Sequence, residues 1–146
     1  MKNRRQKGNK ILEVENLSKE FPGVKALSNF DFELHRGEVH CLIGENGAGK
    51  STFIKILSGF FKPNSGKMFI DGYQYSFLNP YLARKIGIQT VYQEDILVPQ
   101  ISASENIFLG SEKKNQKLFV SYKGMVNRAK KLANNLGIYL RIEEKY

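Results

Sequence analysis

Hydrophobic and polar positions alternate through the first part of the chain, which is the pattern of β-strands. Residues 11–17 alternate in part, and residues 26–34 alternate loosely. The Pro22-Gly23 pair between these segments indicates a turn. Residues 39–43 carry a single polar side chain and are typical of a short strand buried on both faces. The opening of the chain is therefore predicted to be rich in β-structure.

The pattern changes after this opening. Residues 53–57 place apolar side chains at helical spacing. Residues 67–70 have the pattern of a strand, and the Asp71-Gly72 pair indicates a hairpin turn into residues 73–75. A helix followed by a β-hairpin is predicted here.

A short helix and a further strand are predicted next. Asn79-Pro80 suits the N-cap and the first position of a helix that ends near Gly87. Residues 88–92 have the pattern of a strand.

Two helices are predicted in the last part of the chain. Either Ser102 or Ser104 is expected to cap a helix over residues 105–109. A longer helix is expected over residues 122–136, stopped by Gly137. Its apolar face consists of Val126, Ala129, Leu132, Ala133 and Leu136.

Residues 44–52 (GENGAGKST) lie between the predicted buried strand and the helix that follows it. This is the pattern and the context of a phosphate-binding loop. Glycines let the backbone N–H groups approach phosphate oxygens, and the helix start adds further donors. Lys50 is expected to reach the β- and γ-phosphates, and the Ser51 hydroxyl to bind Mg²⁺. The alternative, a glycine-rich turn that binds nothing, would not require every position of the motif to be filled.

Composition and charge narrow the class of protein. The 146 residues are 41% hydrophobic and 25% charged, as in a globular domain, and no apolar run is long enough to span a bilayer. The net charge is +9, but five of the basic residues lie within residues 1–10, which hold no acidic residue and no apolar signal segment. We expect a flexible basic tail there rather than a nucleic-acid site. The single cysteine, Cys41, is expected to be a buried strand residue in a reducing compartment.

Four ordered segments resemble the ATP-binding subunits of ABC transporters. They are residues 21–27 (FPGVKAL), 37–40 (GEVH), 44–52 and 101–110 (ISASENIFLG). Together they are similar to the importers of simple sugars of the ribose, galactose and xylose type. The resemblance runs from about residue 11 to residue 137 and adds specificity that the phosphate loop alone lacks.

The resemblance implies a role for several side chains. Phe21 stands where the family places an aromatic ring against adenine, and Val24 is expected to pad the same ring. Ser51 and Gln93 correspond to the family's Mg²⁺ ligands, and Thr52 is expected to contact the α-phosphate. The implied ligands are ATP and Mg²⁺, and the implied phosphate-binding residues are Gly44, Asn46, Gly47, Ala48, Gly49, Lys50, Ser51 and Thr52.

The resemblance also implies a fold and an assembly. The fold is expected to be α/β, with an incomplete P-loop NTPase (RecA-like) core, an antiparallel β subdomain and the start of a helical subdomain. The expected parts are a basic tail (1–10), the N-terminal part of the nucleotide-binding domain (11–121) and the beginning of the helical subdomain (122–146). Implied partners are the transmembrane permease subunits, a second nucleotide-binding domain and, indirectly, a sugar-binding protein, at the cytoplasmic face of the cell membrane.

The sequence departs from the family pattern after the glutamine at position 93. It contains no LSGGQ-type signature and no apolar run that ends in Asp-Glu, and both histidines precede the phosphate loop. No catalytic residue is therefore assigned, and Glu94 and Asp95 are expected to lie in a solvated loop. We expect a truncated ABC-type ATPase that binds ATP without efficient hydrolysis. Its central strand would lack neighbours, which predicts a marginal or aggregation-prone fragment.

Three functions remain open at this point. The first is the motor of a sugar importer, as the resemblance implies. The second is a non-hydrolysing nucleotide-binding remnant or regulatory module. The third is an ABC-type protein that acts on ribosomes or DNA, which the positive charge suggests but its concentration in a short tail disfavours.

Overall fold

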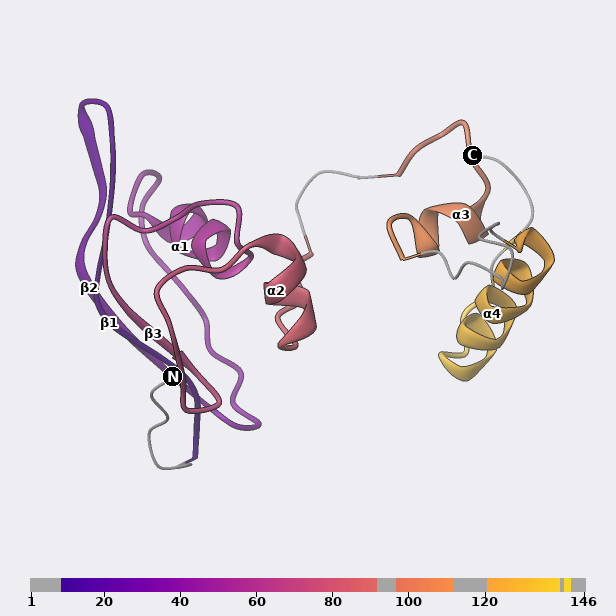
Figure 1. The fold of residues 1–146 in the computed structure, drawn as a ribbon, viewed down its shortest axis with the longest axis horizontal. Helices are drawn as coiled ribbons and strands as arrows, with labels where there is room; N and C mark the ends of the chain where they lie inside the picture. Colours follow the sequence, from indigo (N-terminus) through magenta and orange to yellow (C-terminus); the bar gives the residue numbers. More distant parts are fainter. Residues whose placement is uncertain (1–8, 92–96, 112–120, 140, 143–146) are drawn as a thin grey trace. The chain divides into compact units, whose positions relative to one another are not determined.

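The computed structural model describes residues 9–91, 97–111, 121–139 and 141–142. The chain divides into two compact units, Met1–Val91 and Tyr92–Tyr146 (Figure 1). Within the described ranges, no helix combines the length and the apolar character that crossing a bilayer requires.

A four-stranded antiparallel sheet forms the frame of the first unit. Its strands are β1 (Lys10–Phe21), β2 (Val24–His35), β3 (Ser65–Ile70) and β4 (Tyr73–Tyr75), in the order β2-β1-β3-β4. Pro22-Gly23 joins the two long strands, and a positive φ of 78° at the glycine suits the third position of a type II turn. The predicted turns at Pro22-Gly23 and Asp71-Gly72 are confirmed, and the first pair of strands is longer than predicted.

The core of the first unit lies between this sheet and two helices, α1 (Lys50–Leu57) and α2 (Pro80–Lys85). Figure 1 shows α1 alongside the sheet. The sheet contributes alternate residues because alternate side chains of a strand share one face. The buried members of the core are Leu12, Val14, Leu17, Leu27, Phe53, Ile56, Leu57, Met68, Ile70, Leu78 and Ala83.

Helix α2 begins where the sequence predicts. The side-chain oxygen of Asn79 accepts a hydrogen bond of 2.7 Å from the backbone N–H of Leu82. Pro80 occupies the first position of the helix, where its missing N–H costs nothing. The predicted cap is therefore confirmed.

The second unit contains α3 (Ala103–Phe108) and α4 (Tyr122–Asn135). Ser102 rather than Ser104 caps α3, and its backbone N–H donates in return to Glu105 at 2.8 Å, which completes a capping box. The buried apolar cluster of this unit consists of Phe108, Met125, Val126, Ala129, Ala133 and Ile142.

The predicted apolar face of α4 is only partly correct. Three of its five members are buried, but Leu132 and Leu136 are 43% and 63% exposed, and Met125 is buried instead. The buried apolar residues that join this cluster from outside the helix are Phe108 and Ile142. Helical spacing predicts which side chains share a face but not how far a neighbour extends along that face.

Two predicted strands are absent. Residues 39–43 and residues 88–91 have no regular secondary structure, and Val39, Ile43 and Val91 are 92%, 93% and 99% exposed. Cys41, expected to be buried, is exposed as well. A strand of this apolar type is held by hydrogen bonds to neighbours on both sides, and the described part of the chain contains no strand beside either segment.

Candidate nucleotide-binding site

The loop that precedes α1 lies directly against strand β2. Gly49, the N-cap of α1, adopts a left-handed conformation with φ 86°. A Cβ atom at this residue would lie 2.4 Å from the carbonyl oxygen of Ala26 and 2.7 Å from Cδ2 of Leu27. Glycine is therefore required here both by the backbone conformation and by the close approach of β2.

The rest of the loop curves back on itself. The backbone N–H of Ala48 donates to the carbonyl oxygen of Glu45 at 3.2 Å, and Gly47 has φ 89°. A Cβ at Gly44 would lie 3.2 Å from that of Ala48. All five residues from 44 to 48 are exposed, so this concave stretch of backbone faces solvent.

The first turn of α1 offers free backbone donors. Gly49 cannot cap the helix with a side chain, and the first turn holds no acidic residue. The first four N–H groups of any α-helix lack an intrahelical acceptor. Together with the positive end of the helix dipole, they make this point of the fold suitable for an anion.

Lys50 bridges the two ends of the loop. Its Nζ atom donates to the carbonyl oxygens of Gly44 at 2.6 Å and Glu45 at 2.7 Å. An ammonium group has three donors, so these two bonds leave a third for a phosphate oxygen. Ser51 is exposed and Thr52 is half-buried next to it.

Phe21 and Val24 face each other across the turn of the first hairpin, where they form a register pair. Val24 is 59% exposed, and the half-buried ring of Phe21 meets the ring of Phe61 edge-on at 5.1 Å. Ala26, which Gly49 approaches closely, lies two residues after Val24 on β2. The structure therefore places the phosphate loop against β2 close to the hairpin turn that carries the predicted base-binding residues Phe21 and Val24.

The donor set fits Mg²⁺ only in part. Among the described residues, no group of three or more His, Cys, Asp or Glu side chains could hold a metal ion. Mg²⁺ in nucleotide sites takes most of its ligands from phosphates and water, so one exposed hydroxyl, that of Ser51, is compatible with it. The second predicted ligand, Gln93, lies outside the described residues, as do Glu94 and Asp95.

A polar network holds the segment that enters the loop, and sequence reasoning missed it. Glu38 accepts from the backbone N–H of His35 at 2.7 Å, and its carboxylate lies 2.8 Å from Nδ1 of His40 and 3.2 Å from Nδ1 of His35. The hydrogen bond from the His35 backbone, followed by that from His40, lowers the pKa of Glu38. The spacing His-x-x-Glu-x-His was the signal in the sequence that could have revealed it.

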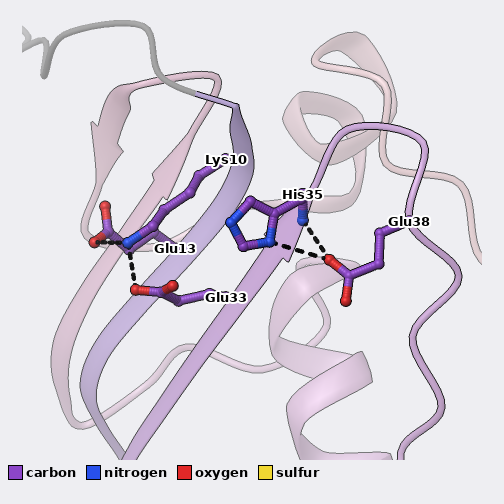
Figure 2. A network of polar contacts seen from close by, with 5 residues as sticks. All are labelled: Lys10, Glu13, Glu33, His35 and Glu38. Atoms are coloured by element: carbon purple, nitrogen blue, oxygen red, sulfur yellow. Dashed lines mark hydrogen bonds and ion pairs between the residues drawn. The ribbon is translucent and has the colours of Figure 1, made fainter.

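A second group of charged side chains lies nearby, around Lys10, the register partner of His35. Figure 2 shows Lys10 bonded to both Glu13 and Glu33, beside His35 and Glu38. The hydrogen bond to Glu33 is the main cause that raises the pKa of Lys10. These charges lie at the open end of the β1–β2 pair, where β2 leads into the phosphate loop.

Aromatic side chains link this entering segment to α1. The ring of His40 meets Phe32 of β2 at 4.8 Å, and Phe32 meets Phe53 of α1 at 5.1 Å. His40 precedes the loop and Phe53 follows it, so both ends of the loop are fixed over β2.

Comparison with known proteins gives this loop a family context. A family model described as ABC transporter matches residues 27–145. Among curated relatives, the ribose import ATP-binding protein RbsA of Hahella chejuensis is 42% identical over 135 residues, which cover 92% of this chain and 27% of the relative. The galactofuranose transporter ATP-binding protein YtfR of Escherichia coli K12 is 47% identical over 134 residues, with 92% and 27% covered. The chain spans about a quarter of the length of these relatives.

Solved structures show the same fold. The ADP conformation of MJ1267, an ATP-binding cassette of an ABC transporter, matches with a TM-score of 0.74 and 25% identity, over 93% of this chain and 57% of that one. A dimeric ABC cassette, MJ0796, has a TM-score of 0.67 at 24% identity, over 92% and 60%, a likeness of fold alone. The predicted fold class is confirmed: a partial P-loop NTPase core with an antiparallel β portion and the start of a helical portion. The chain belongs to the ABC transporter family.

Proposed function

We propose that this chain is the nucleotide-binding part of an ABC importer for a simple sugar. The observation that carries the proposal is the phosphate loop, in which Gly49 lies against β2 and Lys50 bridges the loop ends. Relatives named as ribose and galactofuranose import proteins support the choice of a sugar as the cargo.

In this proposal Mg-ATP binds along the loop. The triphosphate lies against the backbone donors of residues 44–49 and the first turn of α1, and Lys50 neutralises the β- and γ-phosphates. The side chains of Asn46 and Ala48 line the exposed curve of the loop, and Thr52 contacts the α-phosphate. The adenine ring stacks on Phe21, with Val24 beside it.

Mg²⁺, when bound, would neutralise part of the charge of the phosphates. Ser51 would hold it through its hydroxyl, and Gln93 is proposed as the second protein ligand. The exposure of Ser51 at the start of α1 suits a ligand shared with phosphate oxygens and water.

We further propose that the chain alone binds ATP without efficient hydrolysis. Hydrolysis needs a group that activates water, in addition to groups that position the phosphates. The sequence has no apolar run that ends in Asp-Glu, and both histidines precede the loop. A non-hydrolysing binding module is therefore the second candidate function, because it needs only the residues that this chain supplies.

In the assembly that we propose, the chain works at the cytoplasmic face of a cell membrane. Its partners are permease subunits, a second nucleotide-binding domain and, through the permease, a sugar-binding protein. The dimeric state of the MJ0796 cassette supports the second nucleotide-binding domain.

The test is Mg-ATP binding and phosphate release by the 146-residue chain, with Lys50→Ala as the disabled variant and Lys62→Ala as the matched control. Lys62 is exposed and its Nζ lies over the ring of Phe77 at 5.5 Å. Binding that only Lys50→Ala abolishes, without phosphate release, supports the proposal. Binding that survives Lys50→Ala contradicts the site. Phosphate release that depends on Lys50 contradicts the proposed lack of hydrolysis and favours an active ATPase.

A further inference from the structure

The ring of Phe21 is held by two neighbours from different parts of the first unit. Phe61 meets it edge-on, with ring centroids 5.1 Å apart and planes at 72°. The Nζ atom of Lys19, two residues earlier on β1, lies over the ring at 4.9 Å from its centroid. Lys19 also lies 6.0 Å from the centroid of Phe61, so the three side chains form one cluster.

Without these neighbours the ring would be free to turn. Phe21 is the last residue of β1, next to an exposed turn, and Val24 opposite it is 59% exposed. An aromatic pair in the edge-to-face arrangement and an ammonium over a ring face each stabilise one orientation of the ring. Lys19 lies over one face of Phe21, so a base that stacks on this ring would use the opposite face.

Phe61 is fixed relative to the phosphate loop by α1. The helix begins at Lys50 in the loop, and after its last turn the backbone N–H of Phe61 donates to the carbonyl oxygen of Lys55 at 3.1 Å. The turn depends on Gly59, which has φ 83° and lies so close to Asn79 that a Cβ would be 2.4 Å from its carbonyl carbon. A rigid path therefore runs from the phosphate loop through α1 to Phe61.

We propose that Phe61 and Lys19 are positioning residues that hold the Phe21 ring in place for stacking of the nucleotide base. Phe61 sets the distance between the base and the phosphate loop, and Lys19 sets the face on which the base stacks. This inference rests on the proposed function, since it assumes that the base binds on Phe21. It predicts that substitution of either residue weakens binding of the base and leaves binding of the phosphates unchanged.

The test compares binding of Mg-ATP with binding of magnesium tripolyphosphate, which has the phosphates but no base. The variants are Phe61→Leu and Lys19→Met, which keep apolar bulk but remove the aromatic edge or the charge. Phe77→Leu and Lys62→Met are the matched controls, because Lys62 lies over the ring of Phe77 in a similar pair. Phe61→Tyr and Lys19→Arg are the conservative variants, which retain the ring and the cation.

Phe61→Leu and Lys19→Met are expected to raise the Kd for Mg-ATP by about three- to tenfold and to leave the Kd for tripolyphosphate within about twofold of wild type. The controls are expected to change neither value, and the conservative variants to restore ATP binding. Unchanged ATP binding, or an equal loss for both ligands, overturns the positioning role. If the wild-type chain binds neither ligand, the proposed function is contradicted, and so is the positioning role that rests on it. Wild-type chain that binds tripolyphosphate as tightly as ATP contradicts stacking on Phe21 while leaving the phosphate loop intact.

Discussion

Gly49 and Ala26 approach so closely that a Cβ on the glycine would lie 2.4 Å from the alanine carbonyl oxygen. These residues belong to the phosphate loop and to strand β2, 23 positions apart in the chain. This close approach, together with the ring contacts of Phe32 with His40 and Phe53, places the loop beside the first hairpin. The glycine therefore serves the position of the loop as well as its curvature.

Gly49→Ala is expected to destabilise the first unit and to weaken ATP binding. A left-handed conformation alone costs a residue with a Cβ about 1–2 kcal/mol, and the overlap with Ala26 adds to this cost. Gly37→Ala is the matched control, because Gly37 has φ 75° but a Cβ there would meet nothing within 4 Å. Unfolding by denaturant measures both variants. If Gly49→Ala and Gly37→Ala lose the same stability and bind ATP equally well, the close contact between Gly49 and Ala26 has no importance.

The lowered pKa of Glu38 predicts how the stability of the first unit depends on pH. Its pKa is lowered in the folded chain, chiefly by the hydrogen bond from the backbone of His35 and then by that from His40. Its contribution is therefore fully present above the unfolded-state pKa and is lost as the pH falls through the folded-state value, which lies below the ordinary 4.5.

The free energy of unfolding, measured across the acid range, is expected to fall with pH in the wild-type chain and to fall less in Glu38→Gln. Glu20→Gln, on the same hairpin, is the control and is expected to keep the wild-type profile. If Glu38→Gln follows the wild-type profile throughout, the network around the entry to the loop does not stabilise the fold.

The exposure of Val39 and Ile43 predicts that the chain associates in solution. Both side chains are more than nine-tenths exposed, in a segment whose apolar pattern is that of a buried strand. Exposed apolar strand-forming segments promote association. The double variant Val39→Lys, Ile43→Lys is expected to reduce concentration-dependent light scattering without loss of stability.

Val14→Lys is the control for this experiment. Val14 is 1% exposed, so an unpaired charge there is expected to cost more than about 4 kcal/mol. A double variant that loses as much stability as Val14→Lys would mean that residues 39–43 are packed inside the folded chain.

Local signals in the sequence predicted local structure well. Asn79 caps α2 and Ser102 caps α3, because a side chain that bonds to a backbone N–H three residues on needs no distant partner. The hairpin turns at Pro22-Gly23 and Asp71-Gly72 were predicted for the same reason.

Features that depend on distant residues were predicted poorly. Residues 39–43 have the composition of a strand, but a strand exists only when another lies beside it, and composition does not report that. The phosphate loop could be predicted from its motif. Its anchoring on Ala26, the bonds of Lys50 to the loop carbonyls and the contact of Phe61 with Phe21 all join segments whose proximity only the fold reveals.

The central claim is that residues 44–52 bind the phosphates of a nucleotide, and amide NMR spectroscopy of the chain tests it residue by residue. Addition of Mg-ATP is expected to shift the N–H signals of Gly47, Gly49 and Ser51, while those of β4 stay in place. Lys50→Ala is expected to remove the shifts. Signals of the loop that do not move in the wild-type chain at saturating Mg-ATP, or that move equally in Lys50→Ala, would contradict the account.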